Sequence, residues 1–308
     1  MSRSERSRVA VCICTYRRPG VLEDLLATIA RQADEARGWT EVSVAVVDDD
    51  PSGSAGPIAE AAAERFEGGL TYRCTGSGNV AIARNQAIDL GSAGSDLLLM
   101  IDDDCRPAPG WLGEMVSVQR RTGADAVAGA CDTELPPGSP RWLREEPFFD
   151  EASTGEDGGE VSEGYLKNLL VTTTFLEEHD LRFDLRFGES GGEDAMFLHQ
   201  ARGHGMRMVY AAHALVRERL PPERTGLRYQ LRRRWWYGNT EAVTSIASGR
   251  ASSARMAVSG MKTAALGLTR PVARVIRRES PQIRFAASEV LRGAGRILGA
   301  IGVELDHR

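Results

Sequence analysis

Two apolar segments of this chain each run directly into three consecutive aspartates. Residues 42–47 precede the aspartates at 48–50, and residues 97–101 precede those at 102–104. Apolar runs of this length, interrupted here only by Ser43, are typical of strands buried on both faces of a parallel sheet. Because such a sheet gathers the carboxyl ends of its strands at one edge, both acidic triplets are expected where α/β folds bind ligands.

The rest of the N-terminal part alternates apolar runs with helical patterns. A further run at residues 9–14 predicts another buried strand, and the β-α-β-α order indicates an α/β fold with a mostly parallel sheet flanked by helices. The length of 308 residues suits one large domain with a smaller appendage. We therefore expect a catalytic domain at residues 1–216 and a helical extension at residues 217–308.

Charge is distributed unevenly between these two parts. Residues 1–216 carry a net charge of −16 and residues 217–308 a net charge of +11. The acidic part suits cations, and the basic part suits phosphates or an anionic membrane. The overall net charge of −5 argues against a general nucleic-acid binder. An amphipathic basic helix is predicted from an apolar stripe formed by Ile283, Ala287, Val290, Leu291, Ala294, Ile297, Leu298 and Ile301.

The sequence shows no clear pattern for secretion, membrane insertion or cysteine-based metal and disulfide sites. Five cysteines without a C-x-x-C pair suit neither a zinc ribbon nor a disulfide scaffold. Residues 1–8 lack the apolar core of a secretory signal, and no run of 18 apolar residues occurs. We expect a cytoplasmic protein, at the inner face of the cell membrane if the basic extension binds lipid.

The D-x-D formed by Asp102 and Asp104 is the strongest candidate for chemistry. Carboxylates at a ligand-binding sheet edge suit Mg²⁺ or Mn²⁺, which bind a few carboxylates together with substrate phosphates. A solvated acidic turn is the alternative for this motif taken alone.

Two further segments could be functional or could have a purely structural role. Glu193 and Asp194 follow two glycines at a predicted helix start, where simple capping also explains acidic residues. The segment 232–237 combines three arginines with three aromatic residues, which suits phosphate binding with stacking, a membrane anchor, or an ordinary helix with core tryptophans.

In this order, the segments resemble the family 2 glycosyltransferases with the GT-A fold, over about residues 8–240. Among these, the chain is most similar to bacterial exopolysaccharide-type transferases of single sugars. The matching segments are C-T-Y-R-R-P at 14–19, V-V-D-D-D-P-S-G-S at 46–54, N-V-A-I-A-R-N-Q-A at 79–87, M-I-D-D-D at 100–104, P-A-P-G-W-L at 107–112 and G-G-E-D at 191–194.

The resemblance implies roles for individual residues. Asp194 would be the catalytic base with Glu193 beside it, and Asp104 would bind the metal, with Asp102 reaching the ribose or a bound water. Either Asp48 or Asp49 would accept the N–H of the base. The nucleotide-binding set is Thr15, Tyr16, Arg17, Asp48, Asp49, Arg84, Asp102 and Asp103, the metal set is Asp104 and Asp102, and the acceptor side is Asn168, Gly192 and Trp235.

The implied activity is a metal-dependent, inverting transfer of one sugar from a nucleotide-diphosphate sugar, with a UDP-sugar favoured. The acceptor would be a hydroxyl of a lipid-linked sugar or a small molecule, in polysaccharide, glycolipid or natural-product biosynthesis. Residues 232–235 read R-R-R-W in place of the Q-x-x-R-W of processive synthases, which favours single transfers. The basic extension would contact a membrane or mediate oligomerisation.

Two other functions are alternatives. A sugar-phosphate nucleotidyltransferase shares a similar sheet, but residues 14–20 lack its G-x-G-x-R start. A degenerate sugar-nucleotide-binding scaffold is the non-enzymatic alternative, and the presence of both the D-x-D and the Glu193–Asp194 pair argues against it.

Overall fold

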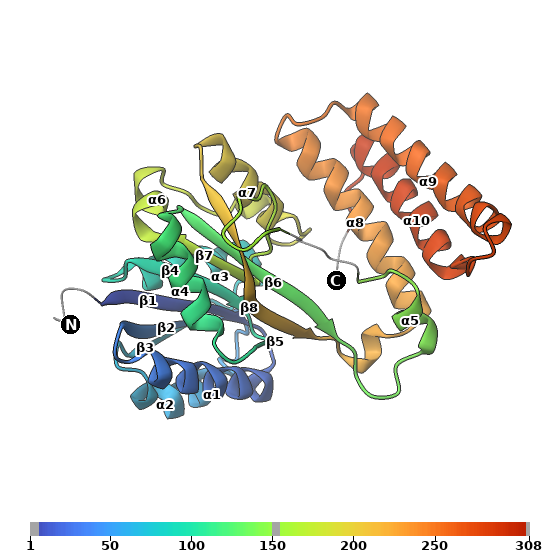
Figure 1. The fold of residues 1–308 in the computed structure, drawn as a ribbon. Helices are drawn as coiled ribbons and strands as arrows, with labels where there is room; N and C mark the ends of the chain where they lie inside the picture. Colours follow the sequence, from blue (N-terminus) through green and yellow to red (C-terminus); the bar gives the residue numbers. More distant parts are fainter. Residues whose placement is uncertain (1–5, 150–154, 306–308) are drawn as a thin grey trace. The chain divides into compact units, whose positions relative to one another are not determined.

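A computed structural model describes residues 6–149 and 155–305 (Figure 1). Its centre is a sheet with the strand order β3-β2-β1-β4-β7-β6-β8-β5. The strands are β1 (Ser7–Thr15), β2 (Thr40–Asp48), β3 (Leu70–Cys74), β4 (Leu97–Asp102), β5 (Cys105–Pro107), β6 (Ala126–Glu134), β7 (Asn168–Thr172) and β8 (Met208–Arg219).

Helices flank the sheet or follow it in the chain. They are α1 (Pro19–Ala36), α2 (Gly56–Ala62), α3 (Val80–Ser92), α4 (Trp111–Thr122), α5 (Arg141–Glu145), α6 (Thr173–Glu178), α7 (Glu193–Gly203), α8 (Leu227–Ala247), α9 (Ser253–Ile276) and α10 (Ile283–Ala300). Short 3₁₀ segments are η2 (Ala63–Arg65), η3 (Leu185–Phe187) and η4 (Pro222–Arg224). This architecture confirms the α/β fold expected from the sequence.

The strands β3, β2, β1 and β4 are parallel, as the apolar runs predict. Thr15 pairs with Asp48, and Cys14 pairs with Asp102, so the ends of three strands meet at one edge. The sheet also contains antiparallel pairs, because β7 runs against β4 and β6, and β5 runs against β8. Both acidic triplets therefore begin at the same edge.

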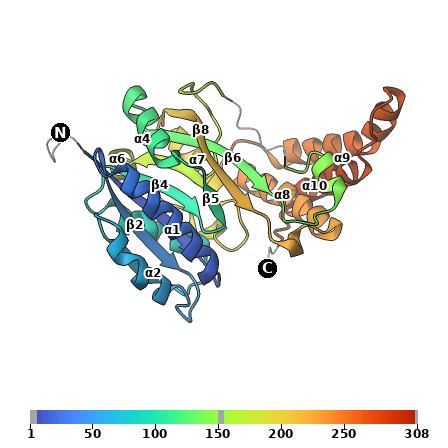
Figure 2. The same ribbon diagram turned by 60° about the horizontal axis from the view of Figure 1, so that its bottom comes forward.

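The central strands are buried on both faces. In β1, Val11 and Ile13 pack into one apolar cluster with residues of α1 and α4, whereas Ala10 and Cys12 pack into a second cluster with residues of α3, α6 and α7. Figure 2 shows α1 and α2 along one face of the sheet. This two-sided burial explains why the strand sequences are continuously apolar.

The described chain forms two compact units. The first comprises residues 6–134, 155–188 and 197–219, and the second comprises residues 135–149, 189–196 and 220–305. The basic C-terminal segment expected from the sequence supplies most of the second unit. The first turn of α7, with Glu193 and Asp194, belongs to the second unit, whereas the D-x-D belongs to the first.

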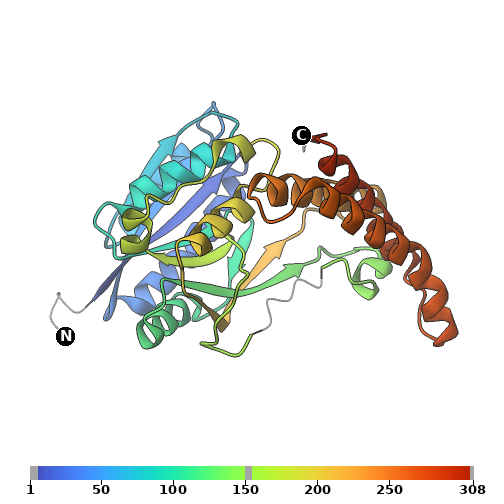
Figure 3. The same ribbon diagram turned by 90° about the horizontal axis from the view of Figure 1, so that it is seen from above.

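The second unit is built around α8, α9 and α10 (Figure 3). The predicted helix at 283–301 is present as α10, but its most buried positions are small residues, namely Ala286, Ser288, Gly293, Gly295, Gly299 and Ala300. A Cβ atom on Gly260 of α9 would lie 2.6 Å from the carbonyl oxygen of Gly293, so glycine permits close packing of these helices. In the described part of the chain, no helix is long and apolar enough to cross a membrane.

Candidate active site

The side chain of Asp48, at the end of β2, is completely buried and closes the loop that follows it. Its Oδ1 accepts a hydrogen bond from the backbone N–H of Asp50 at 2.9 Å. Its Oδ2 accepts from the backbone N–H of Ala55 at 2.8 Å and from the hydroxyl of Tyr72 at 3.2 Å. Burial, followed by the charge of Asp48, raises the pKa of Tyr72 to about 12. Both oxygens of Asp48 are thus engaged within the fold.

The next aspartate, Asp49, organises the glycine turn before α3. Its Oδ1 accepts hydrogen bonds from the hydroxyl of Thr75 at 2.8 Å, from the N–H and hydroxyl of Ser77 at 2.8 and 2.7 Å, and from the N–H of Gly78 at 3.1 Å. These donors all converge on one oxygen atom. The two aspartates therefore differ: the fold engages both oxygens of Asp48, whereas the bonds that order this turn use only Oδ1 of Asp49.

Asp50 anchors the polar turn after β1. Its carboxylate accepts hydrogen bonds from the hydroxyl of Ser52 at 2.6 Å and from Nε of Arg17 at 3.3 Å. These bonds, the Ser52 hydroxyl first, lower the pKa of Asp50 to about 2. Arg17 has a positive φ of 56° and lies over the ring of Tyr16, which is half exposed. The turn thus presents an aromatic ring and a guanidinium group to solvent.

The acidic triplet after β4 is held by two hydrogen-bond donors from the β1 turn. Thr15 donates its hydroxyl to Asp103 Oδ2 at 2.7 Å. Nη1 of Arg18 bonds both Asp103 Oδ1 at 3.0 Å and Asp104 Oδ2 at 2.9 Å. Asp102 is more exposed and lies 3.5 Å from Nη2 of Arg84. Sequence reasoning assigned no role to Arg18, although it lies in the C-T-Y-R-R-P segment.

Negative charge accumulates at Asp104. Its pKa is raised to about 6, first by burial and then by the charges of Asp102, Glu218 and Asp103, while Arg18 opposes the shift. Glu218, on β8, is a second residue that sequence reasoning missed, and it also pairs with Lys167 at 2.8 Å. A carboxylate whose charge is disfavoured in this way is well suited to a cation.

The residues at this edge fit a partly hydrated divalent ion. Within residues 6–149 and 155–305, no three His, Cys, Asp or Glu side chains converge as a complete metal site. Mg²⁺ commonly binds through one or two carboxylates and completes its coordination with water and substrate phosphates. Both oxygens of Asp103 are engaged, one by Thr15 and one by Arg18, whereas Arg18 bonds a single oxygen of Asp104. Asp104 and Asp102 are therefore the better candidates for that role.

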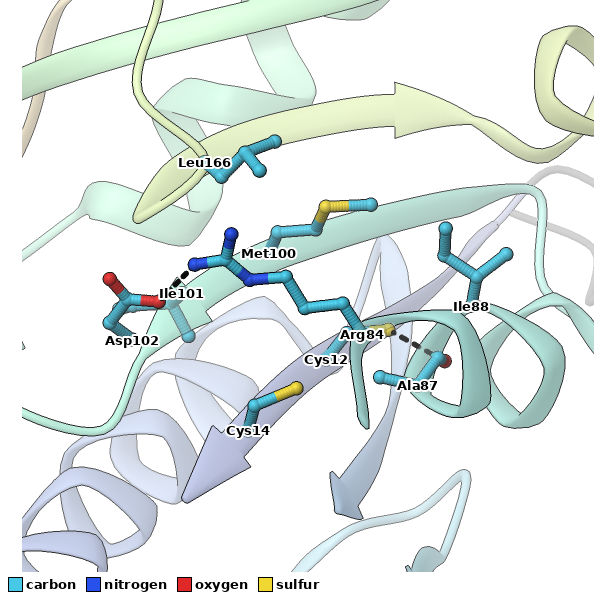
Figure 4. A pocket seen from close by; sticks show the side chains of 9 residues that line it. All are labelled: Cys12, Cys14, Arg84, Ala87, Ile88, Met100, Ile101, Asp102 and Leu166. Atoms are coloured by element: carbon cyan, nitrogen blue, oxygen red, sulfur yellow. Dashed lines mark hydrogen bonds and ion pairs between the residues drawn. The ribbon is translucent and has the colours of Figure 1, made fainter. Parts of the chain in front are cut away.

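A small cavity of about 20 Å³ lies behind Asp102 and Arg84, which point toward one another at its side (Figure 4). Cys12, Cys14 and Met100 also line it. Burial raises the pKa of Cys14 to about 12, so its thiol is neutral at physiological pH. A space of this size accommodates about one water molecule and no sugar.

Asn168 is fully buried and braces the interior of the sheet. Its Oδ1 accepts from Nε1 of Trp111 at 2.8 Å, and its Nδ2 donates to the carbonyls of Ala130 and Ala214 at 2.8 and 2.7 Å. The side chain has no exposed surface in this structure, and an acceptor-side role for Asn168 stays a prediction. Its amide is required to pair buried polar groups.

The second unit holds the acidic pair at the start of α7. Glu193 is buried, at 7% exposure, whereas Asp194 is half-buried and accepts a hydrogen bond from the N–H of Ala195 at 2.7 Å. Gly192 has a φ of +97°, and a Cβ atom on it would lie 2.5 Å from a methyl carbon of Thr244. Only glycine therefore fits where this turn approaches α8.

The arginine-aromatic segment lies within α8. Arg232 lies over the ring of Trp236 at 4.3 Å, and Arg233 lies over Tyr237 and donates to its hydroxyl at 2.8 Å. Trp235 is half-buried, and burial lowers the pKa of Arg234. These arginine–aromatic partners lie one helical turn apart on α8. Phosphate binding and membrane anchoring by this segment stay predictions.

Comparison with known sequences identifies related proteins. The family model described as "Glycosyl transferase family 2" matches residues 10–179. The succinoglycan biosynthesis protein ExoM of Rhizobium meliloti (strain 1021) is 30% identical, over 98% of this chain and 95% of that protein. A glucosyl-dolichyl phosphate glucuronosyltransferase of Haloferax volcanii is 26% identical over 56% of this chain and 58% of its own length.

Solved structures with the same fold are more distant in sequence. Residues 1–349 of S. aureus TarS in complex with UDP match with a TM-score of 0.55 and 15% identity, over 94% of this chain and 89% of that one. Mannosyltransferase PcManGT from Pyrobaculum calidifontis, in complex with GDP-Man and Mn²⁺, matches with a TM-score of 0.58 and 16% identity, over 97% of this chain and 77% of that one. The chain spans 39% of a longer TarS structure. These similarities show the GT-A fold.

Proposed function

Because this chain belongs to glycosyl transferase family 2 and has the GT-A fold, we propose that it transfers one sugar from a nucleotide-diphosphate sugar to an acceptor hydroxyl, with inversion at the anomeric carbon. The cluster of Asp102 and Asp104 with Arg18 and Arg84, at the carboxyl edge of the parallel strands, is the observation that carries this proposal. The naming of ExoM for succinoglycan biosynthesis supports a place in polysaccharide formation.

Asp104 and Asp102 are the residues that would hold Mn²⁺ or Mg²⁺. When bound there, the ion supplies positive charge that stabilises the leaving diphosphate. Thr15 and Arg18 keep Asp103 fixed and thereby position the two flanking carboxylates. The neighbour in complex with GDP-Man and Mn²⁺ supports a divalent metal in this fold.

The nucleotide would bind along the ends of β1, β2 and β4. Thr15, Tyr16 and Arg17 contact the base and ribose, and Arg84 supports the nucleotide from α3. Of the two candidates for accepting the base N–H, we choose Asp49, since both oxygens of Asp48 are engaged by the fold. The TarS structures contain UDP and UDP-GlcNAc and the PcManGT structure contains GDP-Man, which supports a nucleotide-sugar donor, and the choice of UDP stays a prediction.

Asp194 is proposed as the base that removes the proton of the acceptor hydroxyl as it attacks the anomeric carbon. It is half-buried, whereas Glu193 is almost completely buried, which favours Asp194 for contact with a substrate. Gly192 and Trp235, in the same unit, are proposed for the acceptor side. The acceptor would be a lipid-linked sugar or a small molecule, and a cytoplasmic location stays a prediction.

Replacing Asp49 by asparagine tests the choice between the two aspartates. Asparagine keeps the Oδ1 acceptor that orders the glycine turn. Its NH₂ group replaces Oδ2 and cannot accept a hydrogen bond from the N–H of the base. Loss of a hydrogen bond to a charged group predicts about 10- to 100-fold weaker UDP binding in titration calorimetry. Asp48→Asn, the matched control, is expected to lower the melting temperature instead, and unchanged UDP affinity in Asp49→Asn would assign the base contact elsewhere.

Nucleotide release tests the proposed function as a whole. UDP-, GDP- and dTDP-sugars are each incubated with the full chain and Mn²⁺, and the released nucleoside diphosphate is measured. We expect slow release from a UDP-sugar that stops when EDTA removes the metal. Turnover of a nucleoside triphosphate with a sugar 1-phosphate would indicate a nucleotidyltransferase. Neither release nor metal-dependent nucleotide binding would indicate a degenerate binder.

A further inference from the structure

Helix α9 packs on one side only. Toward α10 it presents Gly260 and Gly267, where added Cβ atoms would lie 2.6 Å from the carbonyl of Gly293 and 2.7 Å from that of Ala286. Its other side is covered with large apolar side chains that remain exposed to solvent. Leu268 is 69% and Ile276 is 77% exposed, and the other exposed members are Val258, Met261, Leu266, Val272 and Val275.

Most of these side chains form one continuous stripe. Val258, Met261, Ala265, Leu268, Val272 and Val275 follow one another at intervals of three or four residues, which places them on a single face of the helix. Isolated exposed apolar residues are normal on protein surfaces, whereas a contiguous apolar patch marks an interaction surface. We call these six residues the α9 stripe.

Helix α9 itself carries basic and no acidic side chains, and Glu279, just after it, pairs with Arg274 at 3.2 Å. Between residues 242 and 278 the sequence contains no aspartate or glutamate. Lys262 is exposed beside the stripe, four residues after Val258 and three before Ala265, and Arg270 is exposed farther round α9, next to Leu266. The basic residues of this segment are Arg250, Arg255, Lys262, Arg270, Arg274, Arg277 and Arg278. A helix that exposes an apolar stripe together with cations and no acids complements a bilayer that carries anionic headgroups.

We infer that α9 lies along an anionic membrane surface, with the α9 stripe at the boundary of headgroups and acyl chains and the flanking cations on lipid phosphates. The helix at 283–301, which the sequence offered for this role, has its small-residue face packed in the second unit, so the exposed surface belongs to α9. The inference goes beyond the proposed transfer reaction and does not depend on it.

A second copy of the chain is the competing occupant. The three- and four-residue spacing of the α9 stripe also suits helix pairing. However, pairing two copies through this face would bring their cations together with no acidic side chain in the segment to offset the repulsion. The charge pattern therefore favours lipid.

Vesicle co-sedimentation of the full chain tests the inference. We expect binding to vesicles of equal parts phosphatidylcholine and phosphatidylglycerol, weakening as salt is raised. Leu268→Gln/Val272→Gln removes two exposed apolar side chains and should weaken binding about tenfold. Lys262→Gln/Arg270→Gln should weaken it by about 30-fold at low salt, from about fivefold for each charge. Leu185→Gln, which changes an exposed leucine of the first unit, is the matched control and should bind like the wild type.

Two results would overturn the inference. Absence of wild-type binding, or equal binding by Leu268→Gln/Val272→Gln and the wild type, overturns it. If the wild type sediments as a dimer without binding vesicles and this variant sediments as a monomer, the α9 stripe is a self-association surface. Circular dichroism establishes that the variants are folded. Nucleotide release, measured without vesicles, reports separately on the transfer chemistry.

Discussion

Asp194→Asn is expected to lower the rate of UDP release from the donor by about 10²–10⁴-fold, the usual contribution of a general base. Donor affinity should stay close to that of the wild type, since the proposed nucleotide contacts come from Asp49 and the β1 turn. Asparagine has nearly the same shape as aspartate and keeps the Oδ1 atom that accepts from the N–H of Ala195. The loss would therefore be chemical and not structural.

The measurement separates kcat from binding. UDP release with saturating donor and Mn²⁺ gives the rate, and calorimetry with UDP gives the affinity. Glu189→Gln, which neutralises an exposed acid in the same segment, is the matched control and should retain the wild-type rate. Near wild-type turnover by Asp194→Asn would remove Asp194 as the base, and Glu193→Gln would then be the next variant to measure.

Asp104→Asn is expected to abolish the dependence of UDP binding on Mn²⁺. In the wild type, the metal should tighten UDP binding and raise the melting temperature in the presence of UDP, because a ligand that binds only the native state stabilises it. An amide is a poor ligand for the ion in place of a carboxylate, so about 100-fold weaker UDP binding in Mn²⁺ is expected. The affinity measured in EDTA should be the same for both proteins.

Without metal, Asp104→Asn should be more stable than the wild type. Burial and neighbouring carboxylates raise the pKa of Asp104 to about 6, above its unfolded value, so its negative charge disfavours the native state at neutral pH. Replacing it with a neutral amide should raise the melting temperature in EDTA. Asp132→Asn, which neutralises an exposed carboxylate on β6, is the control and should retain the Mn²⁺ effect. Retention of that effect by Asp104→Asn would place the metal elsewhere.

The local sequence pattern was sufficient for much of the fold. A run such as residues 97–101 is apolar at every position because it packs against helices on both faces, and that requirement is visible without coordinates. The convergence of Thr15, Asp48 and Asp102 followed from parallel pairing alone. The antiparallel strands β5 and β7 were not predicted, since pairing direction depends on connections that residue periodicity does not encode.

The site was predicted less completely than the fold. Arg18 contacts Asp103 and Asp104, more than eighty residues later in the chain, and no local pattern distinguishes it from Arg17. Glu218 acts on Asp104 from another strand in the same way. The resemblance suggested an acceptor-side role for Asn168. Residues distant in sequence, such as Trp111, bury its side chain completely.

By itself the sequence determined the buried parallel strands and the helices between them, the shared edge at which the acidic triplets lie, and the family to which the chain belongs. These properties depend on apolar periodicity and on residues close together in the chain. Only the tertiary structure decided which oxygens of Asp48 and Asp49 are already engaged and which helix of the second unit leaves its apolar face in water. Those outcomes depend on hydrogen bonds and packing between distant segments, because burial is a property of the folded surroundings of a residue and not of the residue itself.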